Sequence, residues 1–447
     1  MAFRPDKRTL KKCHIFGMLK AHAKGKHLSF HTPGHKAKGW DITELSYSDN
    51  LACPQGAILR AERDAAEILG ADRSFFLTDG STAGVLSMLY AAKRLGARSV
   101  AFPENAHKSV YNGCKLLGLR PVLLAVPRWR FVTLQPPRGE LTAKIGGADA
   151  LLLVSPDYYG NLADLAFARR LCGESGKLLL VDGAHGGHLH FEEKIYAGTY
   201  ADLWVDGVHK SLPALTQGAV VSARAPALSE ALGEAVGIFR TSSPSYPVLA
   251  SVEYALKFPR NERLEERAFR FAARFPGRVY TGGDWTKITA LFGRRAFDAE
   301  KYLESKGIYA EFCDGDGVMF YLSPATKMRE LAALERALSK MFSSPEWSDV
   351  PAEKSAPSAP SERAQTAPSP APSGGVENAV VKYLPLSEAI GKPAARTCGL
   401  FPPCMPLVQA GERLTEESAR LLSSASNVFG LGECRTFPAL CGRDDRA

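Results

Sequence analysis

Short apolar runs alternate with stretches of helical periodicity along most of the chain. The runs occupy residues 74–77, 99–102, 121–126, 150–154, 178–181 and 203–205, and each is followed by proline or a polar residue. Residues 83–95 and 105–117, after the first two runs, repeat apolar side chains at helical spacing. Buried strands that alternate with helices predict an α/β protein with a mostly parallel, doubly wound sheet.

A smaller set of elements follows this region. Residues 287–292, 310–313 and 318–322 are predicted strands of a second α/β domain. Proline, serine and alanine dominate residues 343–375, so this segment cannot bury a core and is predicted to be an extended linker. A chain of 447 residues is also too long for one core. The predicted division is an N-terminal arm (1–73), a large domain (74–275), a small α/β domain (276–342), the linker (343–375) and a C-terminal α+β unit (376–447).

Composition narrows the classes of protein to consider. Apolar residues make up 45% and charged residues 23%, and no run is long enough to span a membrane. The net charge of +9 is concentrated in part between Arg4 and Lys26, where no nucleic-acid-binding module accompanies it. The nine cysteines form no C-x-x-C pair, which favours reduced thiols. We therefore expect a cytoplasmic protein with neither nucleic acid nor a membrane as its partner.

Polar motifs follow several of the predicted strands. Gly80, Ser81 and Thr82 lie where a strand turns into a helix, a position that suits either phosphate binding or an ordinary helix cap. His107 follows the next strand and is either a helix-start residue or a flat ring beside a ligand. The motif SPDYYG at 155–160 is a turn whose tyrosines can line a pocket. Because the carboxyl ends of parallel strands share one edge, these motifs are expected to converge.

Asp182 and Lys210 carry the most specific chemistry. Asp182 follows an apolar run directly, so its carboxylate begins buried and needs a cation, a cap or a metal as partner. Lys210 follows the next strand, in contrast to most lysines, which are solvated. An amine that binds an aldehyde and an acid that keeps a pyridine nitrogen protonated are what a pyridoxal phosphate site needs. His185, His188 and His190 leave a metal open as an alternative, but their spacing does not specify one, and no metal is predicted.

These motifs together resemble the Orn/Lys/Arg decarboxylase family of fold-type I pyridoxal phosphate enzymes, in a short form without the N-terminal wing domain of larger members. The resemblance covers nearly the whole chain. It rests on the following segments: HTPGHK (31–36), DGSTAG (79–84), ENAHKS (104–109), SPDYYG (155–160), DGAHGGHLHF (182–191), HKSLPALTQG (209–218), TSSPSYP (241–247) and GLFPPCMP (399–406) with Gly411 and Glu412.

The resemblance implies roles for the site residues. Lys210 would hold the cofactor, Asp182 would pair with its pyridine nitrogen, and His107 would stack on its ring. Thr241 or Ser242 would complete the phosphate site from a neighbouring subunit, which implies a homodimer or a higher homo-oligomer. The remaining cofactor-binding residues implied are Gly80, Ser81, Thr82, His185 and His209, with His209 beside the phosphate.

The chain departs from the family pattern at three positions. Gly207 stands where serine is common, so one phosphate hydroxyl is missing, and Ser211 or the partner subunit is expected to replace it. Asp157 stands where threonine is common and Cys404 where glycine is common, both near the substrate side. The implied reaction is decarboxylation of arginine, lysine or ornithine to an amine of polyamine metabolism and CO2. The alternatives are another fold-type I reaction, such as that of an aminotransferase or a lyase, and a catalytically weak binding or regulatory relative.

Overall fold

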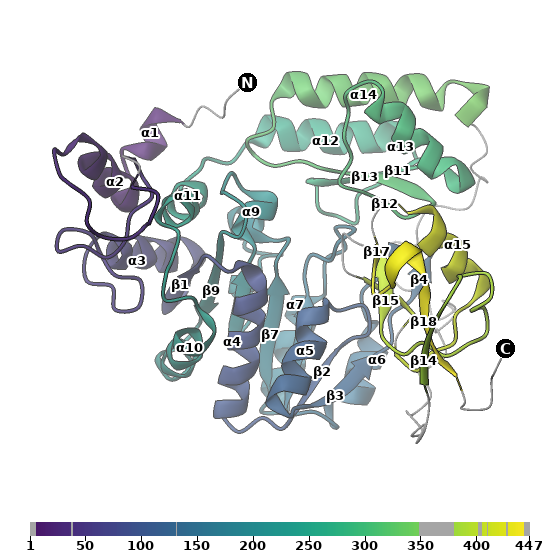
Figure 1. The fold of residues 1–447 in the computed structure, drawn as a ribbon, viewed down its shortest axis with the longest axis horizontal. Helices are drawn as coiled ribbons and strands as arrows, with labels where there is room; N and C mark the ends of the chain where they lie inside the picture. The colour runs from purple at the N-terminus through teal and green to yellow at the C-terminus, as the bar shows by residue number, and fades with distance from the viewer. Residues whose placement is uncertain are drawn as a thin grey trace.

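A seven-stranded sheet forms the centre of the molecule, with strand order β1-β9-β8-β7-β6-β2-β3 (Figure 1). The computed structural model describes residues 6–36, 39–130, 132–347, 380–400, 405–408, 410–425 and 428–441. The strands are β1 (Arg73–Leu77), β2 (Ser99–Pro103), β3 (Arg120–Leu124), β6 (Ala150–Val154), β7 (Leu178–Gly183), β8 (Leu203–Asp206) and β9 (Ala219–Ala223). Only β9 runs antiparallel to its neighbours, β1 and β8, within this sheet. The predicted fold class, a mostly parallel α/β sheet, is confirmed.

Helices cover both faces of this sheet, as its nearly continuous apolar strands require. One core packs Val85, Met88 and Val110 from the first two helices of the large domain against Leu152 and Leu180 of the sheet. The elements in this region are α4 (Gly80–Arg94), α5 (Lys108–Leu117), α6 (Arg138–Ile145), α7 (Leu165–Glu174), the 3-10 helix η1 (Gly187–Phe191), α8 (Ala197–Tyr200), α9 (Val208–Ser211), α10 (Pro226–Phe239), α11 (Tyr246–Leu256) and the short strands β4 (Arg128–Trp129) and β5 (Val132–Thr133).

The N-terminal helices pack against the other face. The helices α1 (Lys7–Leu10), α2 (His14–Lys24) and α3 (Ala57–Leu69) lie beside α11 at the left of Figure 1. Ile15 and Leu19 belong to the same core as Leu249 of α11. Glu253 of α11 accepts hydrogen bonds from the backbone N–H groups that begin α2, at 2.6 and 2.8 Å. The N-terminal arm is therefore tied to the large domain by apolar packing and by a buried carboxylate.

A second, antiparallel sheet lies above the carboxyl edge of the first in Figure 1. Its order is β10-β11-β13-β12, and it contains the three strands predicted between residues 287 and 322. The elements are β10 (Val279–Tyr280), β11 (Lys287–Leu291), β12 (Phe312–Cys313), β13 (Gly317–Tyr321), α12 (Glu262–Arg274), α13 (Ala296–Glu304), α14 (Met328–Phe342) and the 3-10 helices η2 (Gly293–Arg295) and η3 (Pro345–Trp347). These helices and strands share a separate core that includes Phe271, Ile288 and Leu338.

The C-terminal residues form a small α+β unit beside these two parts (Figure 1). The unit contains β14 (Val380–Leu384), β15 (Cys398–Leu400), β16 (Met405–Val408), α15 (Glu416–Ser424), β17 (Val428–Phe429), the 3-10 helix η4 (Glu433–Arg435) and β18 (Phe437–Cys441). Residues 348–375 of the predicted linker, and Cys404 with the rest of 401–404, lie outside the described residues. One apolar cluster joins all three parts, with Tyr158 from the large domain, Phe312 from the small sheet and Ala425 from the C-terminal unit.

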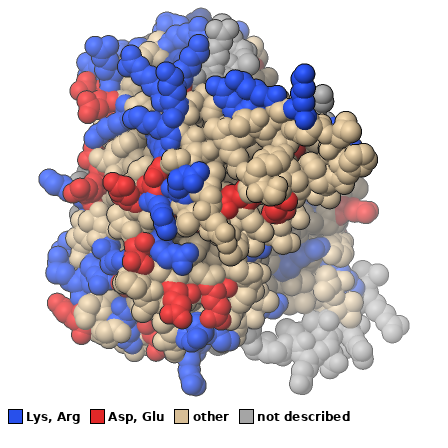
Figure 2. All heavy atoms as spheres, turned by 90° about the vertical axis from the view of Figure 1, so that its left-hand side faces the viewer, with Lys and Arg blue, Asp and Glu red and all other residues tan. Residues whose placement is uncertain are grey.

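The surface over the N-terminal helices carries charges of both signs. Lysine and arginine side chains form several groups on this face, and acidic side chains lie between them, beside a broad area without charged side chains (Figure 2). Exposed large apolar side chains of the N-terminal arm include Leu28, Phe30 and Tyr47. Among the described residues, no helix combines the length and the apolar character needed to cross a lipid bilayer.

Candidate active site

A cavity of about 520 Å³ opens at the carboxyl edge of the large sheet. Its walls include eight of the residues that the sequence singled out: Gly80, Ser81, Thr82, His107, Asp182, His185, His209 and Lys210. They come from four places along the chain, namely the starts of α4 and α5, the end of β7 and the short helix α9. Parallel strands bring these segments together because their carboxyl ends meet at one edge.

Lys210 points its amine at an imidazole. Its Nζ lies 3.0 Å from Nε2 of His185, and Nδ1 of His185 lies 3.3 Å from the Tyr321 hydroxyl. That hydroxyl donates its proton to the carbonyl oxygen of Tyr158 at 3.0 Å. His185 Nδ1 must then carry a proton and donate to Tyr321, which leaves Nε2 as the acceptor for the lysine. Burial and the charges of Lys210 and Lys287 hold the pKa of His185 well below its usual value, which favours this neutral form.

Asp182 is a buried acid with few partners. It ends strand β7 with 3% of its surface exposed. Its carboxylate accepts one hydrogen bond in the part of the chain that the structure describes, from the backbone N–H of Ala184 at 3.1 Å. Burial raises its pKa, while the charge of Lys210 and this hydrogen bond oppose the rise. A buried carboxylate with one neutral donor is suited to a cationic ligand, such as a protonated pyridine nitrogen.

The start of α4 forms a cradle for an anion. Gly80 has a φ of +73°, a conformation that costs glycine little, and it lets the chain turn directly from β1 into the helix. No side chain caps this helix start, and the Gly80 N–H donates to the carbonyl oxygen of Gln217 at 2.9 Å, which leaves the following N–H groups of the first turn for a ligand. The hydroxyls of Ser81 and Thr82 line the same end of the cavity, together with Thr216 and Gln217.

His107 begins α5 and presents a neutral ring. Its Nδ1 accepts from the backbone N–H of Ser109 at 3.2 Å and lies 2.8 Å from that residue's hydroxyl. Burial, together with the charges of Lys210 and Lys108, lowers the pKa of His107 to about 4. The ring is therefore uncharged at neutral pH and can lie against a flat, electron-poor ligand.

Acidic and phenolic side chains line another part of the wall. Asp157 is 4% exposed, and burial raises its pKa to about 7 although Asn161 and Tyr159 donate hydrogen bonds to it. Glu311, just before β12, accepts a hydrogen bond from the Tyr158 hydroxyl at 3.0 Å. Asp157, Tyr158, Glu311 and Tyr321 all line the cavity. This wall therefore carries two acidic side chains, of which Asp157 is only partly ionised near neutral pH.

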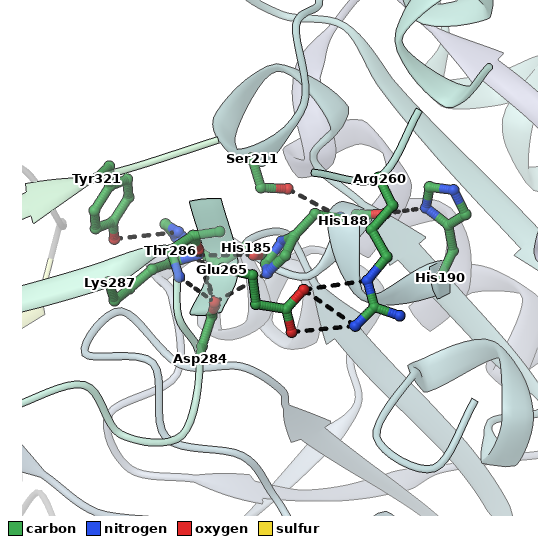
Figure 3. Close-up of polar contacts among 11 residues, drawn as sticks. His185, His188, His190, Ser211, Arg260, Glu265, Asp284, Thr286, Lys287 and Tyr321 are labelled. Atoms are coloured by element: carbon green, nitrogen blue, oxygen red, sulfur yellow. Dashed lines mark hydrogen bonds and ion pairs between the residues drawn. The ribbon is translucent and has the colours of Figure 1, made fainter. Parts of the chain in front are cut away.

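The surroundings of Gly207 explain why the chain has glycine at this position. A Cβ at this position would lie 2.3 Å from the carbonyl oxygen of Ala184, so the backbone leaves no room for a serine. Ser211, one of the two expected replacements for the missing hydroxyl, is fully buried outside the cavity lining, and it accepts a hydrogen bond from the backbone N–H of His188 (Figure 3). Thr241 and Ser242 do not line the cavity of one chain. Thr241 instead donates its N–H to Asp79 at 3.3 Å.

The three neighbouring histidines do not share a ligand position. His185 faces Lys210. Nε2 of His188 lies 2.9 Å from Asp284, and His190 bonds to the carbonyl oxygen of Gly187 at 2.7 Å (Figure 3). Their imidazoles are therefore engaged with separate partners.

Sequence reasoning missed the contribution of the small sheet. Glu311 and Tyr321 lie far along the chain from the motifs, at the ends of short strands. A glutamate or a tyrosine at a strand end is ordinary on a protein surface, so these two residues carried no distinguishing signal. Thr216 and Gln217 lay within the motif HKSLPALTQG, and the positive φ of Gln217, +76°, belongs to the turn that brings them to the cavity.

The fold and the composition of this site define a fold-type I pyridoxal phosphate enzyme. The family model of the Orn/Lys/Arg decarboxylase major domain matches residues 38–275, more than half of the chain. The chain belongs to the Orn/Lys/Arg decarboxylase family and is a pyridoxal phosphate-dependent amino acid decarboxylase.

Similar proteins agree with this assignment. An arginine decarboxylase of Bacillus subtilis (strain 168) is 28% identical over 90% of this chain and 91% of its own length. The uncharacterized protein YaaO of the same organism is 28% identical over 93% of this chain and 95% of its own length. The lysine decarboxylase structure of Francisella novicida has a TM-score of 0.70 at 18% identity, covering 96% of this chain and 80% of that one, which shows the shared fold.

Proposed function

We propose that the cavity decarboxylates L-arginine, L-lysine or L-ornithine to the corresponding amine of polyamine metabolism. The observation that carries this proposal is that two acidic side chains, Asp157 and Glu311, line a cavity that also contains Lys210. A substrate whose amino end reacts at Lys210 can then place a cationic side chain near these acids. Arginine is the first candidate, because three curated relatives whose matches each cover 90% of this chain are arginine decarboxylases.

The proposed roles follow from where each side chain lies. Lys210 holds the cofactor through its amine, and Gly80, Ser81, Thr82 and His209 bind its phosphate. When bound, the cofactor ring supplies a sink for the electrons released as the substrate loses CO2. Asp182 keeps the ring nitrogen cationic, which strengthens that sink, and His107 covers one face of the ring. His185 Nε2, 3.0 Å from Lys210 Nζ, accepts the lysine proton and returns it.

Product analysis tests the reaction. The holoprotein is incubated separately with arginine, lysine and ornithine, and CO2 and the amine formed are measured. We expect one amine to form much faster than the other two, and a keto acid in its place would favour an aminotransferase. Glu311→Gln should raise KM for the preferred basic substrate by about tenfold with a smaller change in kcat. The reason is that the lost ion pair with the substrate side chain stabilises the bound substrate and the transition state equally.

Lys210→Ala is the decisive control for the site. We expect this variant to lose the visible absorbance of the bound cofactor together with activity. If it kept both, the proposed role of Lys210 would be wrong. A wild-type protein that showed no such absorbance after incubation with the cofactor would instead favour the binding or regulatory alternative.

We further propose that the enzyme is a homodimer in the cytoplasm whose subunits complete each other's phosphate sites. Thr241 and Ser242 lie outside the cavity of one chain, and the N-terminal arm exposes Leu28 and Phe30. The cysteines that the structure describes are all unpaired, in keeping with a reducing compartment. Light scattering should give twice the chain mass, and Ser242→Ala should weaken cofactor binding. A monomer with full activity would contradict the shared site.

A further inference from the structure

A buried ionic cluster from the small sheet lies directly behind the active-site histidine. Lys287, at the start of β11, is 1% exposed, and Asp284 is fully buried. Lys287 Nζ donates to Asp284 at 2.9 Å and to the Thr286 hydroxyl at 2.8 Å. Its third hydrogen bond crosses to the large domain, where it reaches the backbone carbonyl oxygen of His185 at 3.0 Å (Figure 3). All three N–H donors of the Lys287 ammonium are therefore engaged inside the protein, where burying a charge is costly.

The other side of the cluster also contacts the large domain. Asp284 lies 2.9 Å from Nε2 of His188, which comes three residues after His185 and is 2% exposed. Burial opposes ionisation of Asp284, but His188 and Lys287 lower its pKa below the usual value. The segment from His185 to His188 is therefore clamped at both ends by one small-sheet loop.

The side chain of His185 links this Asp284–Lys287 cluster to the amine of Lys210. His185 faces Lys210 at 3.0 Å, and its ring is held on the other side by the Tyr321 hydroxyl. Lys287 also supports that tyrosine, because its ammonium lies 5.0 Å from the centre of the Tyr321 ring. Lys287 thus contacts both His185, at its backbone carbonyl oxygen, and the ring of Tyr321, whose hydroxyl faces Nδ1 of His185.

We propose that Lys287, paired with Asp284, is a positioning residue that holds His185 as the hydrogen-bond acceptor of Lys210. The consequence for turnover rests on the role proposed for Lys210. The geometry itself can be tested without substrate or cofactor.

The test is the rate at which an amine-acylating reagent modifies Lys210, measured by mass spectrometry on the full-length, cofactor-free chain. The main variant is Asp284→Asn/Lys287→Met, which removes one charge of each sign and leaves the net charge unchanged, while the amide oxygen introduced at position 284 can still face Nε2 of His188. We expect Lys210 to react about threefold faster or more, because the ammonium form loses its acceptor and more of the amine is unprotonated. Lys287→Arg, which keeps the charge and the donors, should stay close to wild type.

A double-mutant cycle distinguishes positioning from a general structural role. In a His185→Ala background, the Asp284→Asn/Lys287→Met pair should change Lys210 reactivity by less than about 1.5-fold, since the residue through which it acts is absent. An equal effect in both backgrounds would overturn the proposal, as would wild-type reactivity in a folded Asp284→Asn/Lys287→Met protein. If the Asp284→Asn/Lys287→Met protein does not fold, the test is made with the His185→Ala variant. Wild-type reactivity of Lys210 in the His185→Ala variant would also overturn the proposal. Product analysis on the holoprotein separately tests the proposed function.

Discussion

Asp182 shows how one residue can serve function at the expense of stability. Its carboxylate is buried with one backbone donor, and its pKa is raised above the usual value. A carboxyl group whose pKa is raised by folding binds its proton more tightly in the folded state. Its contribution to stability therefore falls as pH rises through the interval between the unfolded and folded pKa values. Without a cation at this position, the ionised carboxylate destabilises the protein at neutral pH.

We therefore predict opposite effects of Asp182→Asn on stability and on activity. The cofactor-free variant should have a higher Tm than wild type at neutral pH, and the difference should shrink as pH falls, because a larger fraction of the wild-type carboxyl is then protonated. The loaded variant should lose about 10²–10³-fold in kcat, as expected when one preorganised electrostatic partner is removed. Thermal melts at two pH values and steady-state kinetics measure these effects. A variant with wild-type kcat would contradict the role proposed for Asp182.

At the residue scale, the sequence singled out the polar residues that follow the strands of the large sheet, but not the cavity residues that the small sheet contributes. Asp182, Lys210 and His107 could be found because each follows a run that can only be a buried strand. Glu311 and Tyr321 could not, because their approach to the cavity depends on how a second sheet packs over the first. That packing is set by tertiary contacts with no local pattern.

At the element scale, the turn between β8 and α9 is fixed by a close backbone approach. The Ala184 carbonyl oxygen lies 2.3 Å from where a Cβ of Gly207 would be. We predict that Gly207→Ser destabilises the protein by about 1–3 kcal/mol, because the added atoms overpack the turn. It should also weaken cofactor binding, since the turn carries His209 and Lys210, although the family often has serine at this position. Urea unfolding and cofactor titration are the measurements.

A control substitution at another glycine separates the steric effect of the added atoms from the general effect of replacing a glycine. Gly237 lies in α10 without a positive φ, and no atom outside its own helix backbone lies within 4 Å of where a Cβ would be. Gly237→Ala should therefore stabilise the protein by up to about 1 kcal/mol. If Gly207→Ser were as well tolerated as Gly237→Ala, the close approach at Ala184 would not limit this turn.

The strands of the large sheet were predictable because they are short, apolar and followed by polar residues or proline. Strand β9 was not among them, although it pairs with both β1 and β8. Its antiparallel direction depends on partners distant in the chain, since Phe75 pairs with Val221. Local periodicity reports that a strand can form, but it does not report the direction in which that strand runs.

At the scale of the whole molecule, the described residues that line the cavity come from the large domain and the small sheet, and the C-terminal unit packs beside them. The apolar cluster of Tyr158, Phe312 and Ala425 joins the large domain, the small sheet and the C-terminal unit beside the cavity. The sequence predicted a C-terminal unit from the Pro/Ser/Ala-rich segment before it, but not its position. Ala425 of this unit and Tyr158, which lines the cavity, belong to that same cluster, so the unit packs next to a wall of the cavity.

The contact between the large domain and the small sheet contains an ion pair whose loss should be measurable. Arg130 donates two hydrogen bonds to Asp316, at 2.6 and 2.5 Å, and both side chains are largely buried. We predict that Arg130→Met lowers the free energy of unfolding by about 3–5 kcal/mol, because Asp316 loses its charge partner inside the protein. Arg130→Met/Asp316→Asn should recover much of this loss, since the unpaired charge is gone. Urea unfolding followed by tryptophan fluorescence compares them, and equal midpoints for wild type and Arg130→Met would show that the pair does not stabilise the contact.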